Sequence, residues 1–354
     1  MGPTILLDKS TLQSLSWKEL SFLYRYYYLN IPPVLIIEIL GDLKKFSDDK
    51  IRGESEVKKI ANKLSSIGDK QINAHYSKIA INSLLGYPIK MKGIPISHKT
   101  PFISRNGAML LEESPEEKAL KRWQIGEFIG TEQILAKRWR ETTRGYDLDL
   151  FKKNLKKIHK KTRKVNSYDD LNILVEELLD IPFNQKYYIR WTIQNLDLIG
   201  GLEKKVLERW EKNNYRTFKN FAPYAYYFFK VDFAFQLGLL NNNLIGTKST
   251  NRVDLEYLYY LPFTEVFSSG DKFLIEFSKI FLNKNQYFIT RDDLKKDLKS
   301  IYEYFNENPE KDNSYPPENK NSFTYQIWQK YRPTQPSSIS EWIESIKKQR
   351  ENKT

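Results

Sequence analysis

The stretch Pro3-Thr4-Ile5-Leu6-Leu7-Asp8 is a short apolar run that ends in a carboxylate, and residues 9–28 after it alternate polar and apolar positions at helical spacing. This pattern predicts a strand followed by a helix. A second unit follows, in which residues 30–38 form a β-branched run that contains two prolines and closes on an acid, and residues 39–45 have a helical pattern. Two such units in succession predict a parallel sheet with right-handed crossovers.

Each predicted strand ends in a carboxylate, Asp8 after the first and Glu38 after the second. The carboxyl ends of parallel strands lie at one edge of a sheet, and open parallel sheets bind ligands there. We therefore expect Asp8 and Glu38 to lie at the same edge. Taken singly, an acid at a strand end is more often the N-cap of the next helix.

Two more acids come from a later part of the chain. Residues 252–261 have the pattern of a helix with Asp254 at its start, and residues 264–269 read as a strand that ends at Gly270-Asp271. Four clustered carboxylates would raise one another's pKa unless a divalent cation neutralised them. Mg²⁺ and similar hard cations prefer such oxygen ligands. Nearby hydroxyls and one more acid could support the site, or could serve only as caps and core groups: Ser10, Ser268, Ser269 and Asp232.

Two of the acids near these runs have simpler interpretations. Asp42 lies one turn after Glu38 and is expected at the surface. Asp232 lies within an apolar run, residues 221–240, that predicts a buried helix, and a buried carboxylate needs a partner. Lys230 and Arg190 are the partners that we expect for it.

The composition excludes several kinds of site. The 354 residues include no cysteine and only three histidines, which rules out disulfides, thiol nucleophiles and Cys-ligated zinc. No G-x-x-x-x-G-K-[ST] loop or strand-linked G-x-G-x-x-G is present, which argues against a nucleotide-hydrolysing or dinucleotide-binding enzyme. The chain carries a formal net charge of +13, which favours an acidic partner such as nucleic acid.

Most of that charge falls in one segment. Residues 118–164 contain 15 Lys or Arg and 5 Asp or Glu, in Lys pairs three or four residues apart that would share a helix face. Such a face suits sequence-independent contacts with phosphates, and the alternative is an ordinary solvated face. Trp123 and Trp139 could stack on bases or belong to the core. The residues expected to contact nucleic acid are Lys137, Arg138, Arg140, Arg144, Lys152, Lys153, Lys156, Lys157, Lys160 and Lys161.

At the four acidic positions the sequence resembles the PIN and PIN-like metal-dependent nucleases. The resemblance rests on "ILLDKS", "PPVLIIEIL", "RVDLEYLYYLP" and "EVFSSGDKFL". It implies a three-layer α/β fold in which Asp8, Glu38, Asp254 and Asp271 hold Mg²⁺ or Mn²⁺ and act in phosphodiester hydrolysis. It also implies RNA in preference to DNA as substrate, and a regulating partner such as a toxin's inhibitor or a phage-defence assembly. The alternative is a catalytically inactive PIN-like protein that binds nucleic acid or serves as a scaffold.

The resemblance covers the two ends of the chain, which suggests how it is divided. We expect a PIN-like domain built from residues 1–84 and 216–305, interrupted by a basic, mostly helical insertion at 85–215. Residues 306–354 read as a Pro-, Asn- and Lys-rich extension that ends in a short helix over 340–348. No targeting or membrane-spanning segment is evident, so a cytoplasmic protein without membrane contact is expected.

Overall fold

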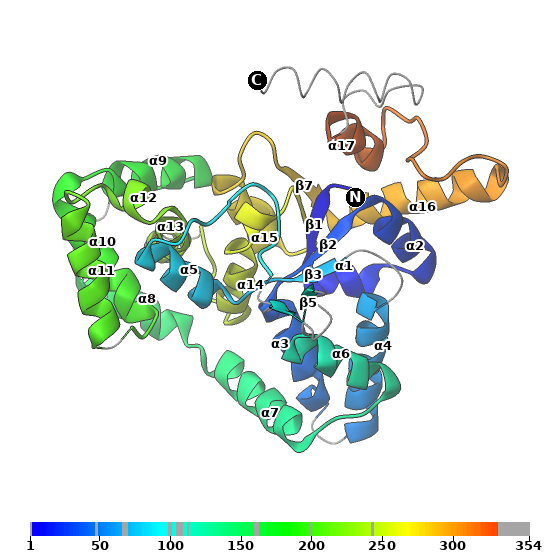
Figure 1. Ribbon diagram of the computed structural model, residues 1–354, viewed down its shortest axis with the longest axis horizontal. Coiled ribbons are helices and arrows are strands. Elements are labelled where there is room, and N and C mark those ends of the chain that lie inside the picture. The colour runs from blue at the N-terminus through cyan, green and yellow to red at the C-terminus, as the bar shows by residue number, and fades with distance from the viewer. Residues whose placement is uncertain are drawn as a thin grey trace.

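The computed structural model describes residues 2–46, 49–65, 70–97, 101–103, 109–111, 113–158, 163–198, 200–241 and 244–331. The helix expected over 340–348 and the site residues Lys160 and Lys161 lie outside these ranges. Figure 1 shows a central sheet with α2 and α16 on one side and α14 and α15 on the other. Helices α8 to α13 lie apart from the sheet, at the left of the view.

The sheet has five parallel strands, in the order β3-β2-β1-β6-β7. Their bounds are β1 (Thr4–Leu7), β2 (Tyr28–Ile31), β3 (Lys70–Ile72), β6 (Val266–Ser269) and β7 (Tyr287–Thr290). The predicted α/β class with a helix-flanked parallel sheet is confirmed. Strand β1 pairs with β2 on one side and with β6 on the other, so the order of strands reverses at β1. In open parallel sheets this reversal leaves a crevice at the carboxyl ends of the strands.

Helices make up most of the rest of the described chain. The α-helices are α1 (Lys9–Ser14), α2 (Trp17–Tyr26), α3 (Pro33–Gly41), α4 (Lys50–Ser65), α5 (Tyr76–Leu85), α6 (Pro115–Ile125), α7 (Gly130–Gly145), α8 (Leu148–Ile158), α9 (Tyr168–Leu179), α10 (Gln185–Asn195), α11 (Gly201–Lys212), α12 (Phe218–Phe221), α13 (Pro223–Leu240), α14 (Thr250–Leu258), α15 (Lys272–Phe277), α16 (Arg291–Glu307) and α17 (Phe323–Tyr331). Short 3₁₀ turns are η1 (Asp42–Lys44), η2 (Pro182–Asn184), η3 (Leu261–Phe263) and η4 (Ser278–Ile280), and β4 (Pro101–Ile103) pairs antiparallel with β5 (Met109–Leu111).

Two of the predicted elements near the N-terminus are wrong in detail. The single helix expected over 9–28 is two helices and the start of β2, because Ser16 and Glu19 form a capping box that begins α2. The strand expected over 30–38 ends at Ile31, and α3 begins at Pro33. Proline at the first position of a helix loses no hydrogen bond and has a suitable φ angle. Glu38 therefore lies within a helix instead of at a strand end.

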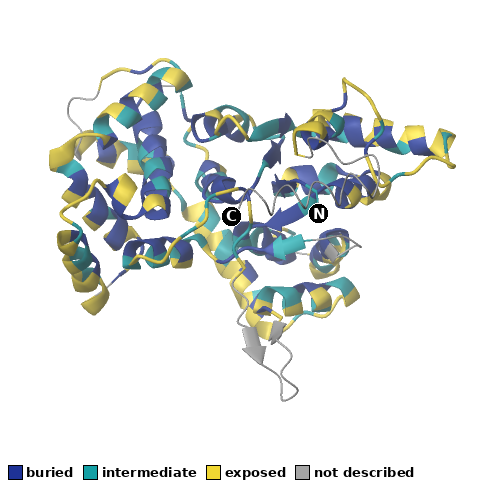
Figure 2. Ribbon diagram, turned by 45° about the horizontal axis from the view of Figure 1, so that its top comes forward, coloured by how far each residue is buried: buried dark blue, intermediate teal, exposed yellow. Residues whose placement is uncertain are grey.

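Other predictions hold. The strand before Gly270 is β6, and the apolar run 221–240 is the buried helix α13, around which α5, α8, α9, α10, α12 and α14 pack. Figure 2 shows the buried residues concentrated in the strands and on the inner faces of the helices. In the C-terminal extension, Trp328 of α17 is buried and donates a hydrogen bond to the carbonyl of Tyr26 at 2.9 Å, so this helix docks on the sheet domain.

Candidate active site

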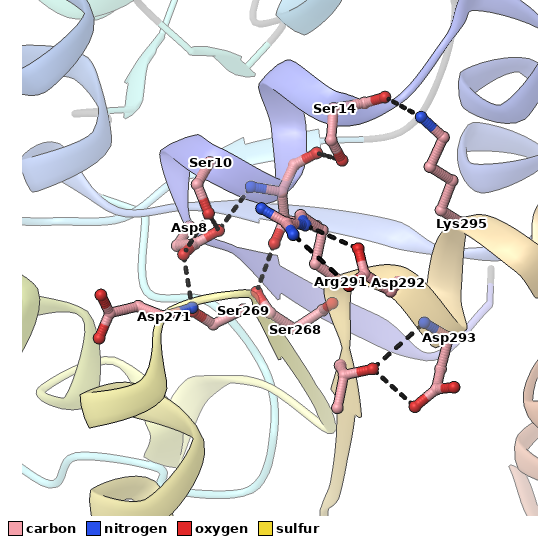
Figure 3. A network of polar contacts seen from close by, with 12 residues as sticks. Asp8, Ser10, Ser14, Ser268, Ser269, Asp271, Arg291, Asp292, Asp293 and Lys295 are labelled. Carbon is pink, nitrogen blue, oxygen red and sulfur yellow. Dashed lines mark hydrogen bonds and ion pairs between the residues drawn. The ribbon is translucent and has the colours of Figure 1, made fainter.

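Asp8 lies at the end of β1, at the point where the strand order reverses. Its backbone is extended, and its side chain caps α1 by accepting a hydrogen bond from the Thr11 amide at 2.7 Å. Two hydroxyls donate to the same carboxylate, Ser10 at 3.0 Å and Ser269 at 2.6 Å (Figure 3). The structure places the Ser10 and Ser269 hydroxyls on the Asp8 carboxylate, and a role for them in supporting the site stays a prediction. The carboxylate is also the N-cap that the simpler interpretation expected.

The side chain of the neighbouring Ser268 points away from Asp8. Successive side chains of a strand point to opposite faces of the sheet. The Ser268 hydroxyl is buried and makes no hydrogen bond with a described residue, whereas Ser269 faces Asp8. Of the two serine hydroxyls, only that of Ser269 hydrogen-bonds to the carboxylate cluster.

Asp271 follows β6 and lies next to Asp8 in the fold. Its Oδ1 accepts hydrogen bonds from the amides of Phe273 and Leu274 at 2.8 and 3.3 Å, which caps α15. Its own amide donates to the Ser269 hydroxyl at 3.0 Å, so Ser269 bridges Asp8 and Asp271. Strands β1 and β6 thereby bring these two acids to the edge of the sheet at which the strand order reverses.

Glu38 and Asp254 reach the same place from helices. Glu38, on α3, accepts a short hydrogen bond from the hydroxyl of Tyr257 on α14. Asp254 is the fifth residue of α14, not its first as expected. Burial, together with the charges of Glu38, Asp271 and Asp8, raises the pKa of Asp254 to about 8. The four predicted acids therefore lie within electrostatic reach of one another.

The pKa of Glu38 also shows the effect of neighbouring acids. Burial raises the pKa of Glu38, and Lys9 and the Tyr257 hydroxyl oppose that rise, while Asp8 and Asp42 add to it. Carboxylates held together in this way carry repulsion that a divalent cation would relieve. In the described part of the chain, no three Asp, Glu, His or Cys side chains form a group that could hold a metal ion as placed. Mg²⁺ commonly takes only one or two direct carboxylates and completes its shell with water and phosphate, so two of these acids would suffice as its protein ligands.

A lysine and a buried aspartate lie beside the acids. Lys9 Nζ is 2.9 Å from the Glu38 carbonyl and 2.7 Å from Asp42 Oδ2. Asp42 is 1% exposed, so the expectation of a surface position was wrong. Arg140 of α7 completes the network, with Nη2 2.8 Å from Asp42 Oδ1 and Nε donating to the Gly41 carbonyl at 2.9 Å. Arg140 therefore anchors α7 to the end of α3.

Arg291 is a residue at this edge that the sequence pattern did not single out. It begins α16 directly after β7, and its Nε contacts Asp292 at 2.9 Å. Asp292 raises the pKa of Arg291, and the charge of Asp8 adds a smaller rise. A Cβ at Gly270 would come within 3.0 Å of the Arg291 guanidinium, so glycine leaves room for it. An arginine after β7 could have been noticed only once the position of β7 in the sheet was known.

Asp232 lies apart from the cluster. Its Oδ1 accepts a hydrogen bond from the Tyr259 hydroxyl at 2.7 Å. Burial raises its pKa, and the charge of Arg252 opposes that rise. The expected partners were wrong, because Lys230 pairs with Glu176 and Arg252 is the cation that acts on Asp232.

Those of the predicted basic residues that the structure describes lie on α7 and α8. Trp123 belongs to the core, and Trp139 is partly buried against it. Lys137 is exposed and 3.9 Å from Glu141, whereas Arg140 is occupied by Asp42. Lys152 is half-buried, and the other described members are exposed: Arg138, Arg144, Lys153, Lys156 and Lys157.

Comparison of the chain with protein-family models, with curated proteins and with solved structures finds no match. Among the described helices, none combines the length and the apolar character needed to cross a membrane.

Proposed function

We propose that this protein is a Mg²⁺- or Mn²⁺-dependent nuclease that hydrolyses phosphodiester bonds, with RNA preferred over DNA. The observation that carries the proposal is the convergence of Asp8, Glu38, Asp254 and Asp271 at the reversal point of a parallel sheet. This is the edge at which such sheets bind their ligands. The preference for RNA rests on the resemblance to the PIN nucleases.

The residues of the site have distinct proposed roles. Asp8 and Asp271 would hold the ion directly, and Glu38 and Asp254 directly or through water. A bound divalent ion would supply an activated water and offset charge on the phosphate. Ser269 holds Asp8 and Asp271 next to each other through its two hydrogen bonds. Arg291 would offer a cation to the phosphate at the same edge of the sheet. A regulating protein partner is part of the proposal, because an uncontrolled nuclease would damage its own cell.

One observation favours the second candidate, an inactive protein that binds nucleic acid or serves as a scaffold. The Lys9 ammonium group lies beside Glu38 and Asp42, where its charge offsets part of the carboxylate repulsion without a metal ion. A lysine that neutralises the cluster would remove the need for the cation.

Cleavage of matched RNA and DNA oligonucleotides in Mg²⁺, Mn²⁺ or EDTA tests the proposal. Wild type should cut RNA faster than DNA, only with metal, and Asp8→Asn and Asp271→Asn should abolish cutting. Asp169→Asn, which removes an exposed carboxylate on α9, is the matched control and should cut normally. Salt-sensitive binding without cleavage under every condition would favour the second candidate.

A further inference from the structure

A cavity of about 360 Å³ lies where the turn between α7 and α8 meets α10, α13 and α14. Aromatic rings form much of its wall, from Tyr146, Trp191 and Phe235. Trp191 packs edge-on against Phe229 with ring centroids 5.0 Å apart, and Phe235 packs similarly against Phe273. The core therefore fixes two of the rings, and the cavity exists before any ligand enters.

Two oppositely charged side chains face this aromatic space. Asp232 is 8% exposed, and its one hydrogen bond with a described residue comes from the Tyr259 hydroxyl at 2.7 Å, to Oδ1. Arg252 donates to the same hydroxyl at 3.4 Å and makes no other hydrogen bond or ion pair with a described residue. Both line the cavity. Asp232 Oδ2 and most of the Arg252 guanidinium thus make no hydrogen bond with a described residue and remain available to a ligand in the cavity.

We propose that this cavity binds a guanine base. A flat ring system suits the aromatic wall. Among the four bases of RNA, guanine alone offers two adjacent N–H donors, N1 and the exocyclic amine, to a carboxylate such as Asp232. It also offers two adjacent acceptors, O6 and N7, to a guanidinium such as Arg252. Adenine has an acceptor at N1 where guanine has a donor, and neither pyrimidine offers two adjacent donor groups.

The bound base is not the one at the proposed cleavage site. Arg252 and Asp254 lie two positions apart on α14 and so project to nearly opposite sides of the helix. The cavity and the carboxylate cluster therefore flank α14 on different sides. The guanine comes either from a free nucleotide or from a base elsewhere in a bound strand, and neither source requires the carboxylate cluster to be active.

Calorimetric titration with guanosine, inosine, adenosine and xanthosine, in EDTA, tests the inference. Guanosine should bind, inosine should bind about ten-fold more weakly because it lacks the exocyclic amine, and adenosine more weakly still. Asp232→Asn should lose guanosine and gain xanthosine, because the new amide donor meets a carbonyl at C2. A gain of binding cannot arise from misfolding. Trp191→Leu should weaken all four, while Asp169→Asn should change none.

A second titration identifies the source of the base. Asp8→Asn protein is titrated with GMP, with a uridine oligonucleotide carrying one central guanine, and with the same oligonucleotide lacking it. GMP binding as tight as that of the guanine oligonucleotide assigns the cavity to a free nucleotide. Tighter binding of the guanine oligonucleotide than of both others assigns it to a nucleic acid strand. Equal binding of all four nucleosides, or no effect of guanine in any ligand, would overturn the inference, and neither result depends on cleavage.

Discussion

Asp8 caps a helix and is a proposed metal ligand, and the choice of substitution can separate these two roles. Its carboxylate caps α1 and accepts hydrogen bonds from Ser10 and Ser269, and it lies in the proposed metal-binding cluster. Asparagine is as good an N-cap as aspartate, whereas alanine forfeits about 1 kcal/mol of capping. We expect Asp8→Asn to lose cleavage and little stability, and Asp8→Ala to lose both.

Urea unfolding and RNA cleavage measured on the same preparations check this expectation. The Asp169→Asn variant controls for loss of a carboxylate. Full cleavage by Asp8→Asn would mean that the charge of Asp8 has no part in catalysis.

The raised pKa of Asp254 predicts how the stability of the fold depends on pH. Its folded-state pKa is about 8, because of burial and three neighbouring acids, and lies well above that of an exposed aspartate. Between the two pKa values the folded chain holds a proton that the unfolded chain has released. The contribution of Asp254 to stability is therefore greatest below the pKa of an exposed aspartate and is lost as pH rises to about 8, by up to about 1.4 kcal/mol per pH unit.

Urea unfolding in EDTA between pH 5 and 8 measures this fall. Asp254→Asn should reduce the slope but not remove it, because burial also raises the pKa of Glu256, to about 7. Asp169→Asn should keep the wild-type slope. The same slope in Asp254→Asn and wild type would show that Asp254 is ionised in the folded protein at neutral pH.

At the scale of elements, the packing of α7 on α3 depends on one buried acid. Asp42 holds Lys9 on one side and Arg140 on the other, at 2.7 and 2.8 Å. Removing one partner of a buried ion pair costs about 3 to 5 kcal/mol, because it leaves a buried charge alone. We expect Asp42→Ala to be strongly destabilising, and Arg140→Ala less so because its guanidinium is partly exposed.

A double-mutant cycle over Asp42 and Arg140, followed by urea unfolding, measures the coupling. The two residues are in contact, so the free energies of unfolding lost by the two single variants should sum to more than the loss in the double variant. Strictly additive losses would mean that Arg140 does not stabilise α7 through Asp42.

The elements that were predictable from sequence are those with one clear pattern. Asp8 directly follows β1 and Asp271 comes two residues after β6, and both positions were predicted from a short run closed by an acid. Residues 30–38 carried two conflicting signals, because a β-branched apolar run suits a buried strand and a buried helix equally. The helix start at Pro33 decided between them, so Glu38 reached the site by a route that its spacing did not predict. Asp42 and Arg140 are 98 residues apart, and no local pattern could pair them.

At the scale of the whole molecule, the basic segment is joined to the acidic site. Asp8 precedes Lys9, Lys9 contacts Asp42, and Asp42 holds Arg140 on α7. Helix α8 follows α7 directly and packs against α13. The net charge was readable from the sequence. The ion pair between Arg140 and Asp42 could not be predicted from the sequence. Because of this pair, Arg140 is not free to contact phosphate as expected.

The exposed lysines of α8 give the last prediction. Replacing Lys153, Lys156 and Lys157 by glutamine should weaken binding of a single-stranded RNA, with Asp8→Asn present to prevent cleavage. The slope of log affinity against log salt concentration should fall by about 2, the value for three lost phosphate contacts on a single strand. The matched control replaces Lys204, Lys205 and Lys212 of α11, which removes the same charge elsewhere. If both triple variants lose affinity and slope equally, net charge alone attracts the RNA. A loss confined to the α8 variant places the strand along the helix that continues from the anchored α7.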